Sequence, residues 1–147
     1  MLNPAAADAA APAAQESRCD VLIVDDSGAS REILASLLRQ VDAGLQIRQA
    51  RDAAQALGAW LELFPRATFL DIDMPDQDGL TLLKTLRRSR PDAFVVMVSG
   101  YSSADNVRQA LAMGANGFVV KPYKPQRIVD MLDRYQALTG RKLGARG

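Results

Sequence analysis

Short apolar runs alternate with longer segments of helical periodicity along this chain. Runs of about four to six residues are too short for helices and predict buried strands. The five predicted strands are Cys19–Val24, Gln46–Ala50, Ala67–Asp71, Phe94–Val98 and Gly117–Val120. The second run alternates apolar and polar residues, as expected at the edge of a sheet. Strand and helix repeat without long loops, so the pattern predicts a doubly wound α/β domain with a five-stranded parallel sheet and helices on both faces.

The segments between these runs place apolar residues at helical spacing and end at Gly or Pro, which stop helices. The predicted helices start near Ser27, Asp52, Leu80, Ser102 and Pro125 and end before Gly44, Pro65, Pro91, Gly114 and Gly140. In the second helix, Trp60 and Leu61 are assigned to the apolar face. In the third helix, Lys84, Arg87 and Arg88 are expected to remain in water.

Composition divides the chain into a leader, a domain and a tail. Residues 1–17 are mostly Ala and are interrupted by Pro, so they are predicted to form a flexible leader, with a short frayed helix as the alternative. They lack the basic start and apolar core of a signal peptide, and no stretch reaches the roughly 20 apolar residues that cross a bilayer. The domain is expected over residues 18–140, followed by a solvated basic tail over residues 141–147. These features predict a soluble, cytoplasmic protein.

The totals narrow the class of protein further. A chain of 147 residues, 48% of them hydrophobic, suffices for one well-buried domain. The formal net charge of +1 gives no general attraction to nucleic acid or to an anionic membrane, so direct binding to either is not expected. The absence of histidine excludes a Ser-His-Asp triad, a phosphohistidine carrier and imidazole-based zinc sites. The single cysteine, Cys19, cannot form an internal disulfide and is predicted to be half-buried and unreactive.

Polar side chains stand at the ends of four predicted strands. The first strand leads into Asp25 and Asp26, and the third ends on Asp71. Ser99 follows the fourth strand, and Lys121 follows the fifth. A lone Asp at such a position often only caps a turn, but the carboxyl ends of parallel strands meet at one edge of the sheet. We therefore expect these side chains to converge on one site.

The chemistry of this set favours a cation and a phosphoryl group. Three carboxylates brought close together repel one another, so that either one takes a proton or a cation neutralises them, and oxygen ligands suit a hard divalent ion such as Mg²⁺. Asp71 could then attack a phosphoryl group and form an acyl phosphate. Mg²⁺ would take one phosphoryl oxygen, Lys121 a second, and the Ser99 hydroxyl with nearby loop amides the third. Gly100, which has no side chain, would leave room for the phosphate.

These stretches together resemble the receiver domain of bacterial response regulators in two-component signalling. The motifs that carry the resemblance are Val24-Asp25-Asp26-Ser27, the run from Leu70 to Gly79, Val98-Ser99-Gly100 and Lys121-Pro122. The resemblance covers about residues 18–140. It implies a flavodoxin-like sheet with strand order 2-1-3-4-5 and a switch point between the strands that carry the acids.

The resemblance also implies a role for each acid. Asp71 would be the phosphoacceptor, and its donor would be a sensor histidine kinase, a phosphotransfer protein or a small molecule such as acetyl phosphate. Asp26 and Asp71 would contact Mg²⁺ directly, and Asp25 mainly through water. The main-chain carbonyl of Asp73 would complete the protein ligands.

Receivers also carry a switch and residues that set the phosphoryl lifetime. The switch positions here are Ser99 and Phe118, and the alternative for Phe118 is an ordinary core residue. Partners of receivers read the surface of the fourth helix, fifth strand and fifth helix, and a phosphorylation-dependent dimer is compatible with this scheme. The lifetime positions are Asp73 and Tyr101, and we hypothesise that the Tyr101 ring slows hydrolysis.

Two alternatives compete with a working receiver. Asp71-Ile72-Asp73 also matches the start of an Asp-x-Asp phosphohydrolase motif, but Met74-Pro75 follows it and the acid pair lies upstream, against that family's pattern. A pseudo-receiver that only binds partners would usually lack an acid or the lysine, and this chain has all of them. No output domain is expected after residue 140, so a receiver would act through another protein, unless the chain is a fragment of a longer regulator.

Overall fold

A five-stranded parallel sheet forms the centre of the molecule in the computed structural model, which describes residues 17–74, 79–100 and 104–144. The strands lie in the order β2-β1-β3-β4-β5, so the predicted order 2-1-3-4-5 is confirmed. Their bounds are β1 Val21–Val24, β2 Ile47–Ala50, β3 Ala67–Asp71, β4 Phe94–Ser99 and β5 Gly117–Val120. The half-exposed strand β2 lies at an edge, as its alternating polarity predicts.

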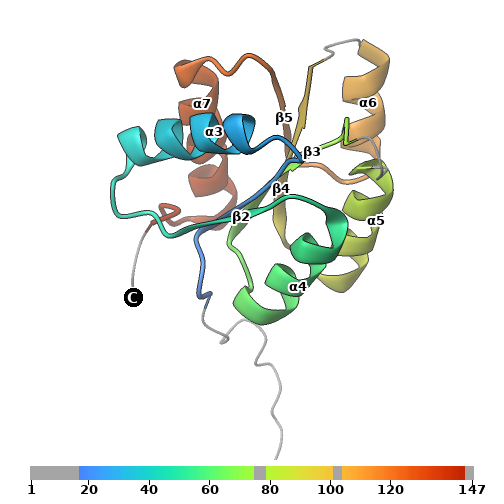
Figure 1. Ribbon diagram of the computed structural model, residues 1–147, viewed down its shortest axis with the longest axis horizontal. Coiled ribbons are helices and arrows are strands. Elements are labelled where there is room, and N and C mark those ends of the chain that lie inside the picture. The colour runs from blue at the N-terminus through green and yellow to red at the C-terminus, as the bar shows by residue number, and fades with distance from the viewer. Residues whose placement is uncertain (1–16, 75–78, 101–103, 145–147) are drawn as a thin grey trace, which may run out of the picture.

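Helices cover both faces of the sheet (Figure 1). Their bounds are α3 Gly28–Val41, α4 Ala53–Leu63, α5 Gly79–Ser89, α6 Ala104–Ala112 and α7 Pro125–Thr139. Helices α3 and α7 lie on one face, and α4, α5 and α6 lie on the other (Figure 1). None of the helices in the described part of the chain is long and apolar enough to cross a membrane.

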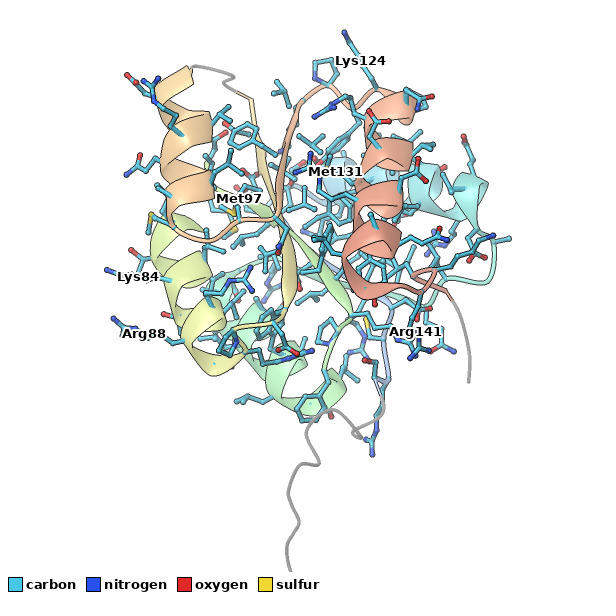
Figure 2. All side chains as sticks on the ribbon, turned by 180° about the vertical axis from the view of Figure 1, so that it is seen from behind. Lys84, Arg88, Met97, Lys124, Met131 and Arg141 are labelled. Atoms are coloured by element: carbon cyan, nitrogen blue, oxygen red, sulfur yellow. The ribbon has the colours of Figure 1, made fainter. Side chains whose placement is uncertain are left out.

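The two cores follow from the alternation of side chains along each strand. On β1, Leu22 and Val24 point into the cluster beneath α4, α5 and α6, whereas Val21 and Ile23 point into the cluster beneath α3 and α7. Met131 of α7 packs into the second cluster (Figure 2). Continuous apolar strands are expected when both faces of a parallel sheet are covered.

Local signals set the helix ends largely as the sequence predicts. The Ser27 hydroxyl accepts a hydrogen bond from the Ser30 amide at 3.2 Å, and the Asp52 carboxylate accepts one from the Gln55 amide at 2.8 Å. Helix α4 ends before Pro65, and Phe64 takes a left-handed conformation there. Gly140 ends α7 with φ 77°, a conformation that glycine adopts without strain.

Four expectations about burial need correction or sharpening. Leu61 is 75% exposed, so its assignment to the apolar face of α4 is wrong, whereas Trp60 is buried and donates to the Thr68 hydroxyl at 2.9 Å. Cys19 is fully rather than half buried, and this burial raises the pKa of its thiol. Leu143 packs into the core beneath α3 and α7, so the expectation of a solvated tail fails at this residue.

Arg87 is part-buried, so the expectation that it remains in water is wrong. Its guanidinium is part-buried and donates to the carbonyl oxygens of Pro91 (2.9 Å), Ala93 and Gly114 (2.6 Å) and to the Asn116 side chain (3.0 Å). Helix α5 ends beside the loops that precede β4 and β5, and those loops offer carbonyl groups with no strand partner. The neighbouring Lys84 and Arg88 project away from α5 into solvent, as expected (Figure 2).

Candidate functional site

Three carboxylates meet at the carboxyl edge of the sheet. Carboxylate oxygens of Asp25, Asp26 and Asp71 all lie within 4.8 Å of one another. Asp25 follows β1 and Asp71 ends β3, and these two strands are neighbours at the switch point of the strand order. Asp25 and Asp71 are buried, whereas Asp26 is exposed. The predicted convergence of the acids is therefore present, with one acid open to solvent.

Lys121 reaches this acidic group from the end of β5. Its Nζ atom lies 2.8 Å from Asp25 Oδ2 and 3.1 Å from Asp71 Oδ2. Burial acts to lower the pKa of Lys121, but the two carboxylates outweigh burial and hold the pKa above its usual value. Lys121 is thus a permanent cation between two acids.

Main-chain amides fix the orientation of the two buried carboxylates. The Ser27 amide donates to Asp25 Oδ1 at 2.9 Å, and the Asp73 amide donates to Asp71 Oδ1 at 2.7 Å. The loop after β3 also packs closely on the start of α5, because a Cβ on Gly79 would lie 2.5 Å from the Ile72 Cα atom. Glycine is therefore required at this contact, which holds the segment directly after Asp71.

Burial affects the two acids in the same direction, but their partners decide the outcome. For Asp71, burial is the largest influence and raises the pKa, although the Asp73 amide and Lys121 oppose it. For Asp25, burial is opposed by Lys121 and the Ser27 amide, which together bring the pKa below its usual value. Asp71 is therefore the more basic of the two buried acids, which suits a nucleophile.

Ser99 lies at the same edge, but its hydroxyl contacts Asp73. The Ser99 side chain is fully buried and donates from Oγ to Asp73 Oδ2 at 2.9 Å. The Gly100 amide donates to the same oxygen at 2.8 Å. In β3 and β4, Asp71 pairs with Val98, so the residue after Val98 stands beside the loop that follows Asp71. The sequence offered no signal for this use of the Asp73 carboxylate.

The acidic group fits Mg²⁺ by its donor atoms. All of the candidate ligand atoms are oxygens, which suit a hard divalent cation. Among the described residues, the buried Asp25 Oδ2 has no hydrogen-bond donor in suitable geometry, although it forms an ion pair with Lys121. Asp26 adds a solvent-facing carboxylate to the set. Buried anionic oxygen with spare coordination capacity is what a divalent ion would use.

The structure describes the predicted switch residue Phe118 but not the predicted lifetime residue Tyr101. Phe118 of β5 is 8% exposed and packs into the core beneath α4, α5 and α6. Its carbonyl oxygen accepts a hydrogen bond from Arg127 of α7 at 3.2 Å, so its main chain contacts the other face of the sheet. Tyr101 lies outside the described residues.

Arg31 is a residue of this site that the sequence reasoning missed. Its Nη1 atom donates to the main-chain oxygen of Asp25 at 2.6 Å, and its Nε atom donates to Gln49 Oε1 at 2.9 Å. Gln49 in turn donates to Glu32 at 2.6 Å. The only signal was a basic residue on the first turn of the helix after the acid pair, a common feature of solvated helices.

A doubly wound sheet with a group of acids at its switch point, and a lysine after β5 that pairs with them, is the architecture of the receiver domains of two-component signalling. The chain belongs to this family, because the model described as "Response regulator receiver domain" matches residues 21–133. Receiver domains of this family serve mostly as non-enzymatic signalling modules.

The chain is also similar to individual proteins that contain a receiver domain. The chain is 31% identical over 115 residues to the chemotaxis protein CheY of Thermotoga maritima, covering 78% of this chain and 94% of the relative. It is 37% identical over 117 residues to the nitrogen assimilation regulatory protein NtrX of Azorhizobium caulinodans, covering 78% of this chain but 25% of NtrX. The crystal structure of the receiver domain of NtrX from Brucella abortus superposes with a TM-score of 0.73 at 35% identity, covering 80% of this chain and 98% of that one. The chain thus spans nearly all of CheY but a quarter of the larger regulator.

Proposed function

We propose that this receiver accepts a phosphoryl group on Asp71 and passes the signal to another protein. The observation that carries the proposal is the position of Lys121, whose Nζ atom contacts both Asp25 and Asp71. A cation beside the nucleophilic oxygen would stabilise the negative charge that develops on a transferring phosphoryl group. The raised pKa of Asp71, due mainly to burial, supports its role as the attacking carboxylate.

The transfer forms one bond and breaks one. A carboxylate oxygen of Asp71 attacks the phosphorus atom of the donor and forms an O–P bond. The P–N bond of a phosphohistidine, or the P–O bond of acetyl phosphate, breaks with its electron pair on the leaving group. The leaving imidazole takes a proton from water, whereas acetate departs as the anion. Lys121 moves with the phosphoryl oxygen, and the Ser99 hydroxyl donates to another of its oxygens.

Asp25, Asp26 and Asp71 would hold a divalent ion, with the main-chain carbonyl of Asp73 as a further ligand. A bound Mg²⁺ would neutralise the carboxylates and one phosphoryl oxygen, so that the phosphate can approach an acidic pocket. Arg31 would keep the main chain of Asp25 in place while this happens.

The partners follow from the family. We place a sensor histidine kinase or a phosphotransfer protein upstream, in the cytoplasm. Downstream, the reading surface would comprise α6, β5 and α7, where Phe118 would respond to Ser99. This surface would bind a protein target or a second phosphorylated copy. Asp73 and Tyr101 would set how long the phosphoryl group survives.

The intact mass of the protein after incubation with acetyl phosphate tests the proposal. We expect a gain of one phosphoryl group that requires Mg²⁺ and decays on standing, because acyl phosphates hydrolyse. Asp71→Asn should abolish the gain, whereas Asp133→Asn, a matched change at an exposed residue of α7, should not. A wild-type protein that gains no mass would favour a pseudo-receiver that only binds partners.

A further inference from the structure

The Asp73 carboxylate stands where the donors for a phosphoryl group converge. Asp73 Oδ2 accepts a hydrogen bond from the Ser99 hydroxyl at 2.9 Å and one from the Gly100 amide at 2.8 Å. Both donors lie at the end of β4, beside the loop that follows Asp71. Asp73 Oδ2 thus occupies the same two donors, a hydroxyl and an amide, that would bind one oxygen of a phosphoryl group.

Each of these donors has a single hydrogen to give. A serine hydroxyl carries one O–H and a glycine amide one N–H, so neither can serve Asp73 and a phosphoryl oxygen fully at the same time. Ser99 is fully buried, and so its hydroxyl cannot turn to bulk water in exchange. A phosphoryl group on Asp71 must therefore displace the Asp73 carboxylate before Ser99 can bind it.

The other donors around Asp71 are also engaged with carboxylates. The Asp73 amide donates to Asp71 Oδ1 at 2.7 Å, and Lys121 pairs with Asp25 and Asp71. All of these contacts involve Asp71 or Lys121, which would themselves take part in the phosphoryl transfer. The Asp73 carboxylate is different because it is not the phosphoacceptor and its removal leaves that machinery intact.

We propose that Asp73 is an internal competitor of the phosphoryl group, a latch that holds Ser99 and Gly100 in the resting protein. This inference rests on the proposed function of Asp71. The Asp73 carboxylate occupies both donors, so it opposes phosphorylation of Asp71. For the same reason it opposes the movement of the Ser99 hydroxyl toward the phosphoryl group. It predicts that the Asp73 side chain controls how readily the site is filled, in addition to any effect on phosphoryl lifetime.

A titration with fluoroberyllate, an analogue of the phosphoryl group, tests the latch. Binding to the full chain would be followed by fluorine NMR at Mg²⁺ concentrations that saturate each variant. Asp73→Ala should bind the analogue about tenfold more tightly than wild type, the factor that corresponds to one net charge-assisted hydrogen bond. Asp73→Asn should fall between them, because its amide oxygen still accepts but carries no charge. The control Asp133→Ala, at an exposed residue of α7, should match wild type.

Equal or weaker binding by Asp73→Ala would overturn the latch, since Asp73 would then be neutral or would orient Ser99 for the phosphoryl group. A second readout does not depend on phosphoryl chemistry. Deuterium exchange of the Gly100 amide in the resting protein should be faster in Asp73→Ala than in wild type, because its acceptor is lost. Unchanged exchange would overturn the latch even if the site binds no analogue. A third outcome separates the two proposals. If wild type binds no analogue but the Gly100 amide still exchanges faster in Asp73→Ala, the result would count against the proposed function and not against the latch.

Discussion

Two part-buried cations, one at each end of the sheet, have opposite surroundings. At the carboxyl edge, Lys121 lies between the carboxylates of Asp25 and Asp71 at 2.8 and 3.1 Å. At the amino edge, the Arg87 guanidinium donates to neutral oxygens of the loops before β4 and β5. The carboxylates raise the pKa of Lys121 despite its burial, whereas burial lowers the pKa of Arg87. Lys121 is therefore held by charge, and Arg87 by dipoles.

The difference separates a site from a structural contact. An amine bound by carboxylates can exchange one anion for another, so Lys121 can follow a phosphoryl oxygen without becoming unpaired. A guanidinium that donates to several main-chain carbonyls has no comparable substitute, because its loss removes the donor from the part-buried carbonyls of Ala93 and Gly114. We expect changes at Lys121 to affect chemistry more than stability, and changes at Arg87 to do the reverse.

The largest effect should come from Arg87→Met. The substitution keeps part of the apolar stem but removes the donor from the part-buried carbonyl oxygens of Ala93 and Gly114, at a cost of about 3 kcal/mol in the free energy of unfolding. Urea unfolding followed by circular dichroism would measure it. Arg88→Met changes an exposed neighbour on α5 and should stay within about 0.5 kcal/mol of wild type. Similar stabilities for the two variants would show that the Arg87 contacts do not hold the loops.

Lys121→Met should have the second largest effect, and it should appear in the rate of phosphorylation. Loss of one cationic donor to a developing anion typically costs about 100-fold in rate. Time courses of mass gain with acetyl phosphate and Mg²⁺ would measure it. Lys124→Met, a change at an exposed residue just before α7, is the matched control and should react at the wild-type rate. A Lys121→Met protein that reacts normally would break the contrast with Arg87.

Arg31→Met should have a smaller effect, on metal affinity. Arg31 contacts the main chain of Asp25 but none of the reacting groups, so its loss should loosen the acidic loop. Removal of such a supporting contact typically weakens metal binding by about tenfold. Calorimetric titration with Mg²⁺ would measure the change, with Arg39→Met on the exposed side of α3 as the control. Unaltered Mg²⁺ affinity would mean that the Asp25 loop needs no help from α3.

The smallest effect concerns pH and the buried Cys19 beside the amino edge of β1. Burial raises the pKa of this thiol in the folded state, so the unfolded chain releases the proton first. The contribution of the thiol to the free energy of unfolding is therefore fully present below the pKa of an exposed thiol, about 8.5, and falls as the pH rises above that value. We expect a loss below about 1 kcal/mol at pH 9.5 that Cys19→Ala abolishes. Identical pH profiles for the two proteins would indicate that the thiol is not protected at this edge.

The parallel sheet and the convergence of the acids could be predicted from the sequence because both depend on local signals, whereas the strand order came from the resemblance to receiver domains. Apolar runs that end in Asp25, Asp71 and Lys121 place these residues at one edge of any parallel sheet. It did not predict the burial of Arg87, because a basic residue on a helix surface looks solvated until the facing loops are placed. The contact between Asp73 and Ser99 was hidden for a related reason, since it joins the loop after β3 to the end of β4, and the two residues are 26 positions apart.

Chemical trapping of the phosphoryl group tests the central claim most directly. Borohydride reduces an aspartyl phosphate to homoserine, and peptide mass mapping after treatment with acetyl phosphate and Mg²⁺ would locate it. Asp71 and Asp73 are separated in the sequence only by Ile72, so fragment ions must separate them. We expect homoserine at position 71 alone, and none in Lys121→Met under the same brief exposure. Homoserine at position 73, or at no position in a protein whose mass has risen, would contradict the assignment of Asp71 as the phosphoacceptor.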